Sequence, residues 1–273
     1  MLNAVRSNEM GRLFNPDSFV HGNSGAGNNW AKGYFSEGCE LIEDVLDNVR
    51  KTVEGCEAMQ AFQIMHSIGG GTGSGLGSLV LEKLREEYSD KLAVTYSIFP
   101  GSTNGGSSDV VTEPYNSVFT LNALIEHSQS IFTIENSALN RICVQNLKID
   151  NPKFEDINHL VAQGMSNCTA TLRFPGYQNN CDYRKLTTNM VPFPRMHFLM
   201  QGQAPLLNRK NVKFESLGVK EVCNQMFDNR CLYSSGDPFT HGKILTGSCM
   251  LRGLNLSTYE SEQSIVTNLK KHQ

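Results

Sequence analysis

The residues of this sequence best suited to chemistry form a glycine-rich stretch, GGGTGSG, at positions 69–75. An apolar run, FQIMHSI, precedes it, and a segment with helical spacing, LGSLVLEKL, follows it. Each glycine costs roughly 0.5–1 kcal/mol relative to alanine inside regular structure, so this density of glycine needs a reason. Unpaired amides at the start of a helix attract phosphate groups. The stretch therefore predicts a phosphate-binding loop, and the alternative is a flexible surface loop.

The two commonest phosphate-binding motifs do not fit this stretch. A P-loop has lysine followed by serine or threonine after its last glycine, whereas Leu76 follows Gly75 here. The dinucleotide pattern G-x-G-x-x-G fails in every frame of the stretch. A nicotinamide-dependent dehydrogenase on a doubly wound sheet is therefore a disfavoured alternative, and a comparison of guanine with nicotinamide binding would decide it.

Hydrophobic periodicity predicts strands that alternate with helices around this loop. The predicted strands are 61–68, 92–99 and 130–134, and the predicted helices are 37–54, 75–88, 113–127 and 136–147. This alternation predicts an α/β fold, in which a parallel sheet carries helices on both faces. Ligands of such sheets bind at the carboxyl ends of the strands. The loops GGGTGSG, GSTNGGSSD and ENS follow the three strands, so we expect them to gather at that edge.

The pattern changes after a long amphipathic helix that is predicted from Phe154 to about Thr171. Pro192 and Pro194 interrupt the helical pattern, because proline cannot continue a helix. The elements predicted beyond them are a helix near 216–228, a strand near 243–253 and a helix near 257–271. We expect a nucleotide-binding domain at 1–172 and a second, smaller α+β domain at 173–273.

Composition excludes several classes of partner. The formal net charge of −3 gives no indication of a basic surface that would bind nucleic acid. The sequence has no apolar run of about 18 residues, so we expect no membrane partner. Its eight cysteines include no CxxC pair, which argues against zinc and fits reduced thiols in the cytoplasm.

Several long motifs together resemble the tubulin family. They are SGAGNNWAKGY at 24–34, GGGTGSG, VVTEPYNS at 110–117, ENSALNRIC at 135–143, and RFPGYQNN, RKL and NMVPFPRMHFLM between 173 and 200. The resemblance covers essentially the whole chain and is nearest to the beta branch, whereas ALNRI and FPGYQNN are similar to gamma tubulin. It implies the tubulin-type fold: a GTP-binding parallel sheet with helices on both faces, a core helix and a partial second domain.

The resemblance also implies which residues bind GTP or GDP. The residues that would lie against the phosphates are Ala26, Gly27, Asn28, Gly69, Gly70, Gly71, Thr72, Gly73 and Ser74. Asp109 and Glu113 match carboxylates near the ribose, although Glu113 also suits a helix N-terminus.

Three further residues would contact the base in such a complex. Asn136 and Asn158 would read the guanine edge, and Phe154 takes the place of a stacking tyrosine. A ring face contributes about 0.5–1.5 kcal/mol in such a contact. The alternatives are that Asn136 caps the helix starting at Ser137 and that Asn158 is a surface amide.

Two other side chains near the glycines favour structural roles. His66 lies in an apolar strand, which favours a hydrogen-bonded core histidine over a ligand or base. Trp30 is the single tryptophan, and we expect it to anchor the core near the phosphate loop.

The family resemblance implies that hydrolysis is completed across a subunit contact. Lys185 stands where alpha-type tubulins carry the glutamate that orients water, so this chain would contact its neighbour's nucleotide without hydrolysing it. Asp182 is a possible substitute acid. The resemblance therefore implies no catalytic residue in cis.

The implied function is a GTP-binding structural subunit of microtubules, in the cytoplasm and cytoskeleton. The implied partners are an alpha-type tubulin in a heterodimer, lateral tubulin neighbours and microtubule-associated proteins, with LNRKNVKFES at 207–216 as a candidate lateral loop. The alternatives are a gamma-like nucleator and a non-functional truncated fragment.

Family members begin well before this sequence and continue beyond it. The acidic residue near magnesium in the family has no counterpart here, so no metal ligand is expected in this chain, although Mg²⁺ accompanies GTP. Without the first strand of the family, the sheet would lose several buried side chains, each worth about 1.5–3 kcal/mol. The total loss would exceed the free energy of unfolding of a typical domain. We therefore expect that the 273-residue chain alone does not fold stably.

Overall fold

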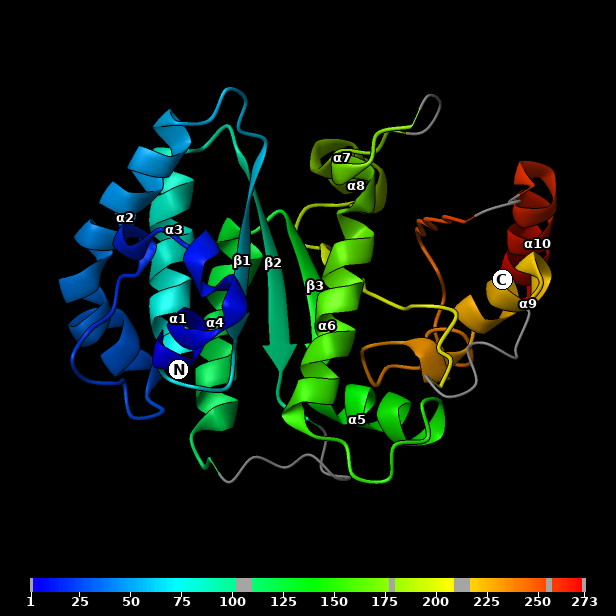
Figure 1. The fold of residues 1–273 in the computed structure, drawn as a ribbon, viewed down its shortest axis with the longest axis horizontal. Helices are drawn as coiled ribbons and strands as arrows, with labels where there is room; N and C mark the ends of the chain where they lie inside the picture. Colours follow the sequence, from blue (N-terminus) through cyan, green and yellow to red (C-terminus); the bar gives the residue numbers. More distant parts are fainter. Residues whose placement is uncertain (1, 102–109, 177–179, 209–216, 254–256, 272–273) are drawn as a thin grey trace.

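The computed structural model describes residues 2–101, 110–176, 180–208, 217–253 and 257–271. Its centre is a parallel sheet of four strands in the order β1-β2-β3-β4 (Figure 1). The strands are β1 (Ala61–Ser67), β2 (Leu92–Phe99), β3 (Ser130–Glu135) and β4 (Phe198–Met200). Because all four are parallel, their carboxyl ends lie at one edge of the sheet. The predicted sheet and its first three strands are confirmed.

One face of the sheet packs against α3 (Gly77–Glu87) and α4 (Glu113–His127), and α2 (Glu37–Glu54) lies outside α3 (Figure 1). The buried core of this face consists of Ile68, Leu81, Ala93, Leu124 and Ile131. It combines apolar side chains from the strands with one residue from each covering helix. The three predicted helices on this side are confirmed.

The opposite face packs against α5 (Asn136–Gln145) and α6 (Phe154–Cys168). Side chains alternate between the two faces along a strand. Accordingly Val94 and Tyr96 of β2 belong to this second core, whereas Ala93 belongs to the first. Leu139 and Leu160 complete it from α5 and α6. Helices therefore cover both faces of the sheet, as the sequence predicted.

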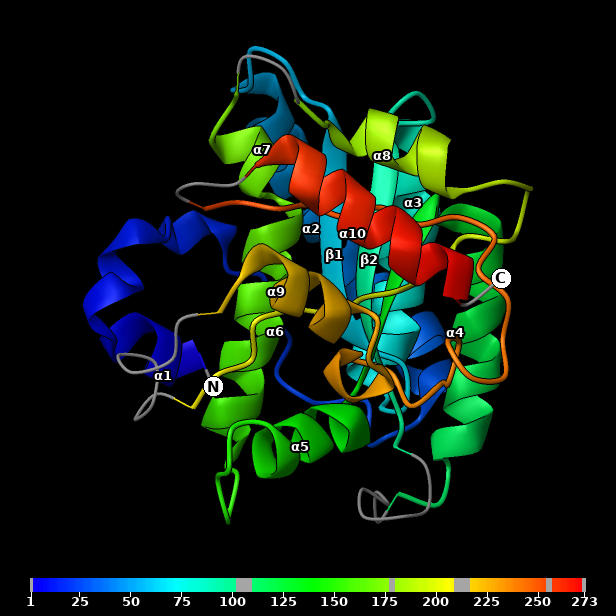
Figure 2. The same ribbon diagram turned by 90° about the vertical axis from the view of Figure 1, so that its right-hand side faces the viewer.

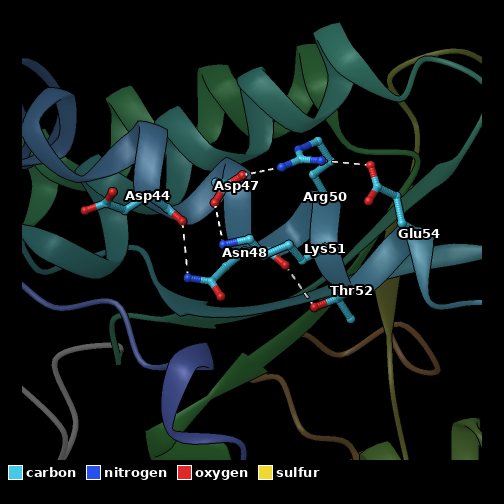
Figure 3. A network of polar contacts seen from close by, with 7 residues as sticks. All are labelled: Asp44, Asp47, Asn48, Arg50, Lys51, Thr52 and Glu54. Atoms are coloured by element: carbon cyan, nitrogen blue, oxygen red, sulfur yellow. Dashed lines mark hydrogen bonds and ion pairs between the residues drawn. The ribbon is translucent and has the colours of Figure 1, made fainter.

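The outer face of α2 is exposed and carries a ladder of charged and polar contacts (Figure 3). Arg50 donates to Asp47 at 2.6 Å and to Glu54 at 2.9 Å, and Lys51 reaches Asp47 at 2.7 Å. These partners are three or four residues apart, which places them on one helix face. Exposed pairs contribute little to stability, so the ladder marks the solvent side of the helix.

Several shorter elements complete the described chain. They are α1 (Leu2–Ser7), 3-10 turns at Glu9–Leu13, Pro16–Ser18 and Asn229–Cys231, π-helical turns at Lys32–Ser36 and Thr72–Leu76, α7 (Ala170–Arg173), α8 (Tyr183–Met190), α9 (Val219–Met226) and α10 (Thr258–Lys271). Figure 2 shows α10 alongside α9, where Asn268 donates to Asn224 at 2.8 Å. Within the described ranges, every helix is too short or too polar to cross a lipid bilayer.

The sequence predictions fail at two places in the carboxyl-terminal part. The strand predicted at 243–253 is wrong, because these residues form no regular structure. A strand needs a neighbour for its backbone hydrogen bonds, and no described strand pairs with this segment. Conversely, β4 was not predicted, yet it extends the sheet by pairing with β3. The domain boundary after residue 172 remains a prediction.

Replacing Leu139 by alanine tests the core beneath α5. Leu139 is fully buried, so we expect Leu139→Ala to lower the free energy of unfolding by about 2–5 kcal/mol. Val144→Ala on the same helix is the control, because Val144 is 46% exposed and its truncation should change little. Urea unfolding measures both. Equal effects of the two substitutions would contradict the described packing.

Candidate functional site

The glycine segment packs backbone against backbone on residues 26–34, a loop that continues into a helix at Trp30. A Cβ atom on Gly71 would lie 2.7 Å from the amide nitrogen of Asn29 and 2.9 Å from the Cβ of Ala26. A Cβ on Gly75 would clash with the carbonyl oxygen of Trp30, and one on Gly33 with that of Gly71. Glycine is therefore required here for close approach.

The loop at 26–30 has an unusual backbone that its neighbours hold in place. Gly27 and Asn28 both have positive φ, 56° and 54°. The carbonyl oxygen of Asn28 accepts hydrogen bonds from Thr112 Oγ1 and Asn116 Nδ2, both at 2.8 Å. Ala26 is buried, whereas Gly27 and Asn28 are exposed. This predicted phosphate loop thus lies directly beside the glycine segment and α4.

A cavity of about 630 Å³ opens at the carboxyl ends of the strands. Its lining residues are Ser67, Gly69, Gly70, Ile98, Phe99, Pro100, Gly101, Glu113, Asn136, Asn140, Pro152, Lys153, Phe154 and Ile157. The volume is in the range of small-molecule sites. Five residues predicted to bind GTP, namely Gly69, Gly70, Glu113, Asn136 and Phe154, therefore line one cavity.

Glu113 lies over the start of the glycine segment. A Cβ on Gly69 would be 2.7 Å from both Cγ and Oε1 of Glu113, so a side chain at this position would displace the carboxylate. Glu113 is also the first residue of α4, where the helix dipole favours a negative charge. Both roles considered for Glu113 are compatible with this position. Asp109 lies outside the described residues.

Asn136 and Phe154 face the cavity from the starts of two helices. Asn136 is the first residue of α5, and the helix has Glu135 in the capping position, without a side-chain cap. The alternative that Asn136 caps a helix starting at Ser137 is therefore wrong. Phe154 begins α6 and is 75% exposed, which leaves its ring free for a ligand. Asn158, one turn later, is exposed and does not line the cavity.

The remaining glycine-segment residues differ in what they offer to a ligand. Thr72 is exposed, Gly73 is half-buried, and both lie in the first turn of the helical segment that continues as α3. Amides in a first helical turn have no carbonyl partner within the helix. Ser74 is fully buried, and its hydroxyl donates to the carbonyl oxygens of Gly70 and Gly71. Its side chain therefore stabilises the loop from within.

His66 and Trp30 support the loops from behind. His66 Nδ1 lies 3.0 Å from the carbonyl oxygen of Gly73, and Nε2 lies 2.9 Å from Ser97 Oγ. Burial lowers the pKa of this imidazole below its ordinary value, so the predicted hydrogen-bonded core histidine is confirmed. Trp30 is half-buried and stacks between Tyr34 and Phe119, with centroids at 4.8 and 5.1 Å.

Lys185 lies away from the cavity, on α8. The cavity contacts the first turn of α6, whereas α7 and α8 follow the other end of that helix (Figure 1). Fifteen helical residues span about 22 Å. Lys185 is exposed, and its Nζ donates to the carbonyl oxygen of Asn180 at 3.3 Å. Asp182, the alternative acid, immediately precedes α8.

Sequence reasoning missed Asn116, the residue that connects these parts. Asn116 is only 3% exposed and bonds to both loops and to the start of α4. Its signal in the sequence is the polar repeat Thr112, Asn116, Thr120, spaced by four and therefore on one face of the helix. A polar residue repeated on the buried face indicates internal hydrogen bonding.

Two family models match this chain. One is described as "Tubulin/FtsZ family, GTPase domain" and matches residues 1–144, and the other, "Tubulin C-terminal domain", matches residues 194–272. The chain belongs to the tubulin family. The resemblance drawn from the sequence motifs is thereby confirmed.

The relatives of this tubulin-family chain include several beta chains. Tubulin beta-6 chain of Gallus gallus and tubulin beta-1 chain of Mus musculus are each 49% identical over 266 residues, which are 97% of this chain and 58% of each relative. Tubulin beta-4 chain of Zea mays is 46% identical over 271 residues, 99% of this chain and 59% of the relative. The chain thus spans less than two thirds of the length of these tubulins.

Replacing Gly71 by alanine tests the backbone packing in this tubulin-family site. The new methyl group would meet Asn29 and Ala26, so we expect Gly71→Ala to lower the free energy of unfolding by about 1–3 kcal/mol. Gly25→Ala in the facing loop is the matched control, because its Cβ would meet nothing within 4 Å. Thermal unfolding measures both variants. A stable Gly71→Ala protein would show that the two segments are not in contact.

His66 should make stability depend on pH. Burial lowers the pKa of His66 in the folded state. Its contribution to the free energy of unfolding is therefore complete above the unfolded pKa of about 6.5 and decreases as pH falls below that value. Between about pH 7.5 and about pH 5.5, we expect wild type to lose more stability than His66→Gln. Urea unfolding at both pH values measures this. His197, whose pKa burial also lowers, is present in both proteins and cancels in the comparison.

Proposed function

We propose that this chain is a beta-tubulin-like, GTP-binding structural subunit of microtubules. The observation that carries the proposal is the cavity at the carboxyl ends of the strands, where Gly69, Gly70, Glu113, Asn136 and Phe154 come together. These residues lie on four different segments of the chain. The beta chains among the relatives support the beta type over a gamma-like nucleator.

The chemistry of the cavity suits the parts of GTP. Bare glycine amides and the first turn before α3 would hold the phosphates, because they offer unpaired N–H groups and a positive dipole end. Glu113 would accept hydrogen bonds from the ribose hydroxyls. Asn136 would offer an amide donor and acceptor to the guanine edge, and the exposed ring of Phe154 would stack on the base.

Magnesium binding has less support in this chain. Within the described ranges, no three histidine, cysteine, aspartate or glutamate residues gather closely enough to hold a metal ion. The described residues therefore offer no such cluster for a protein-held Mg²⁺ ion. We assign no step of the function to the metal.

Hydrolysis is proposed to require a second subunit. Lys185 lies on α8, beyond the end of α6 that is away from the cavity, and it does not line the cavity. In a head-to-tail contact, it would neutralise phosphate charge on the neighbour's nucleotide. Lysine cannot serve as the carboxylate that orients water. The chain's own GTP would then be hydrolysed only against an alpha-type partner that supplies that group.

The proposed partners and location are those of a microtubule subunit. An alpha-type tubulin is the proposed heterodimer partner, with further tubulins beside it and microtubule-associated proteins on the filament surface. The proposed location is the cytoskeleton of the cytoplasm. Most of the candidate lateral loop at 207–216 lies outside the described residues, so its role rests on the sequence alone.

Truncating Phe154 tests the proposed base contact. We expect Phe154→Ala to weaken GTP binding roughly twofold to tenfold, since a stacked ring contributes about 0.5–1.5 kcal/mol. Phe154→Tyr should retain wild-type affinity, because the ring face is kept. Isothermal titration calorimetry with GTP and ATP measures both the affinity and the preference for guanine.

The control for this experiment is Phe193→Ala. Phe193 is also well exposed, at 63%, and does not line the cavity. It should leave GTP affinity unchanged. The proposed function would be wrong if wild-type protein, verified as folded by circular dichroism, bound GTP no better than ATP. The assignment of Phe154 alone would be wrong if Phe154→Ala bound like wild type.

A further inference from the structure

We propose that Asn116 is the positioning residue that joins the two phosphate loops and turns the Gly70 amide toward the ligand. The inference rests on the proposed function and deepens it, because it names how the phosphate part of the site is set. Asn116 lies in the second turn of α4 and is 3% exposed. It does not line the cavity itself.

The amide of Asn116 is fully used. Its Nδ2 donates to the carbonyl oxygen of Asn28 at 2.8 Å and to that of Gly69 at 3.0 Å. Its Oδ1 accepts from the backbone amide of Trp30 at 3.0 Å. An asparagine amide has two N–H donors and one carbonyl acceptor. Two backbone carbonyls next to Nδ2 and one backbone N–H next to Oδ1 therefore fix the orientation of the Asn116 amide.

These partners come from two separate segments. Asn28 and Trp30 belong to the loop after Ala26, and Gly69 begins the glycine segment about forty residues later in the chain. Asn28 has a positive φ of 54°, a backbone conformation that is uncommon for residues other than glycine, although asparagine adopts it more often than most. The hydrogen bond to its carbonyl oxygen compensates for this conformation. One side chain thus holds both predicted phosphate loops against the helix that presents Glu113.

The bond to Gly69 has a direct consequence for the ligand. In a trans peptide the C=O and the following N–H point in opposite directions. Because the Gly69 carbonyl points to Asn116, the N–H of Gly70 points away from Asn116, and Gly69 and Gly70 both line the cavity, which Asn116 does not. An amide in that position is suited to donate to a phosphate oxygen. Asn116 would therefore act on the phosphates through Gly70.

The test compares GTP with guanosine, because only GTP carries the phosphates. Asn116→Ala should weaken GTP binding at least tenfold while guanosine affinity changes less than twofold. A residue that only stabilised the fold would weaken both ligands alike. Asn116→Asp keeps the acceptor for the Trp30 amide but loses both donors, so it should behave like the alanine variant toward GTP. Calorimetry gives the affinities, and circular dichroism verifies folding.

Thr120→Val is the matched control on the same helix. Thr120 is fully buried, and its hydroxyl donates only to the carbonyl oxygen of Asn116, inside α4. This variant should leave the ratio of GTP to guanosine affinity unchanged. The emission of Trp30, the single tryptophan, gives an independent readout of the loop. GTP but not guanosine should alter it in wild type, and the effect should be lost in Asn116→Ala.

Three outcomes separate the possibilities. If wild-type protein that circular dichroism shows to be folded does not bind GTP, the proposed function fails, and this inference fails with it. If wild type binds GTP and a folded Asn116→Ala protein retains the wild-type affinity ratio, only the inference is overturned. If neither Asn116 variant folds, Thr112→Val decides, because the exposed Thr112 hydroxyl also bonds to the Asn28 carbonyl at 2.8 Å. An unchanged ratio there overturns the inference, and a lowered ratio supports it.

Discussion

The contact between two backbone segments, without side chains between them, determines the geometry of this site. Gly33, Gly71 and Gly75 each bring main-chain atoms to where a Cβ would otherwise stand. The two segments are about forty residues apart in sequence, and each continues into a helix, α2 or α3. Close approach therefore places two helix starts side by side at one edge of the sheet. Gly69 and Gly70, which line the cavity, directly precede the closely packed Gly71, so the approach holds the chain next to the cavity.

The glycines thus have two roles, of which the sequence indicated one. Composition alone suggested open amides for a phosphate, and Gly69 and Gly70 do line the cavity. However, Gly71 and Gly75 are buried against the neighbouring loop, so their small size serves packing. A sequence cannot distinguish these roles, because both require the same absent side chain. The distinction needs the partner segment, which lies far away in the chain.

The sheet was predictable where burial produced a regular pattern. β2 and β3 are nearly continuous apolar runs of the length that buried parallel strands require. β4 has three residues and follows a proline-rich turn, so it is too short to show a period. The segment at 243–253 shows the reverse case, since its residues favour a strand but no described neighbour pairs with it. Asn116 escaped notice because helical asparagines usually face solvent.

Helix α6 gives the molecule the polarity that the proposed function needs. Its first turn contributes Phe154 and Ile157 to the cavity, and its last turn leads through α7 to α8 and Lys185 (Figure 1). In the proposed function, the binding site at one end of a subunit meets Lys185 at the other end of its neighbour in a head-to-tail contact. Such heterologous contacts repeat without closing when no rotation returns to the start, and they then build filaments. The separation of Lys185 from the cavity is therefore consistent with the proposed function, in which one contact both extends a filament and completes a neighbour's site.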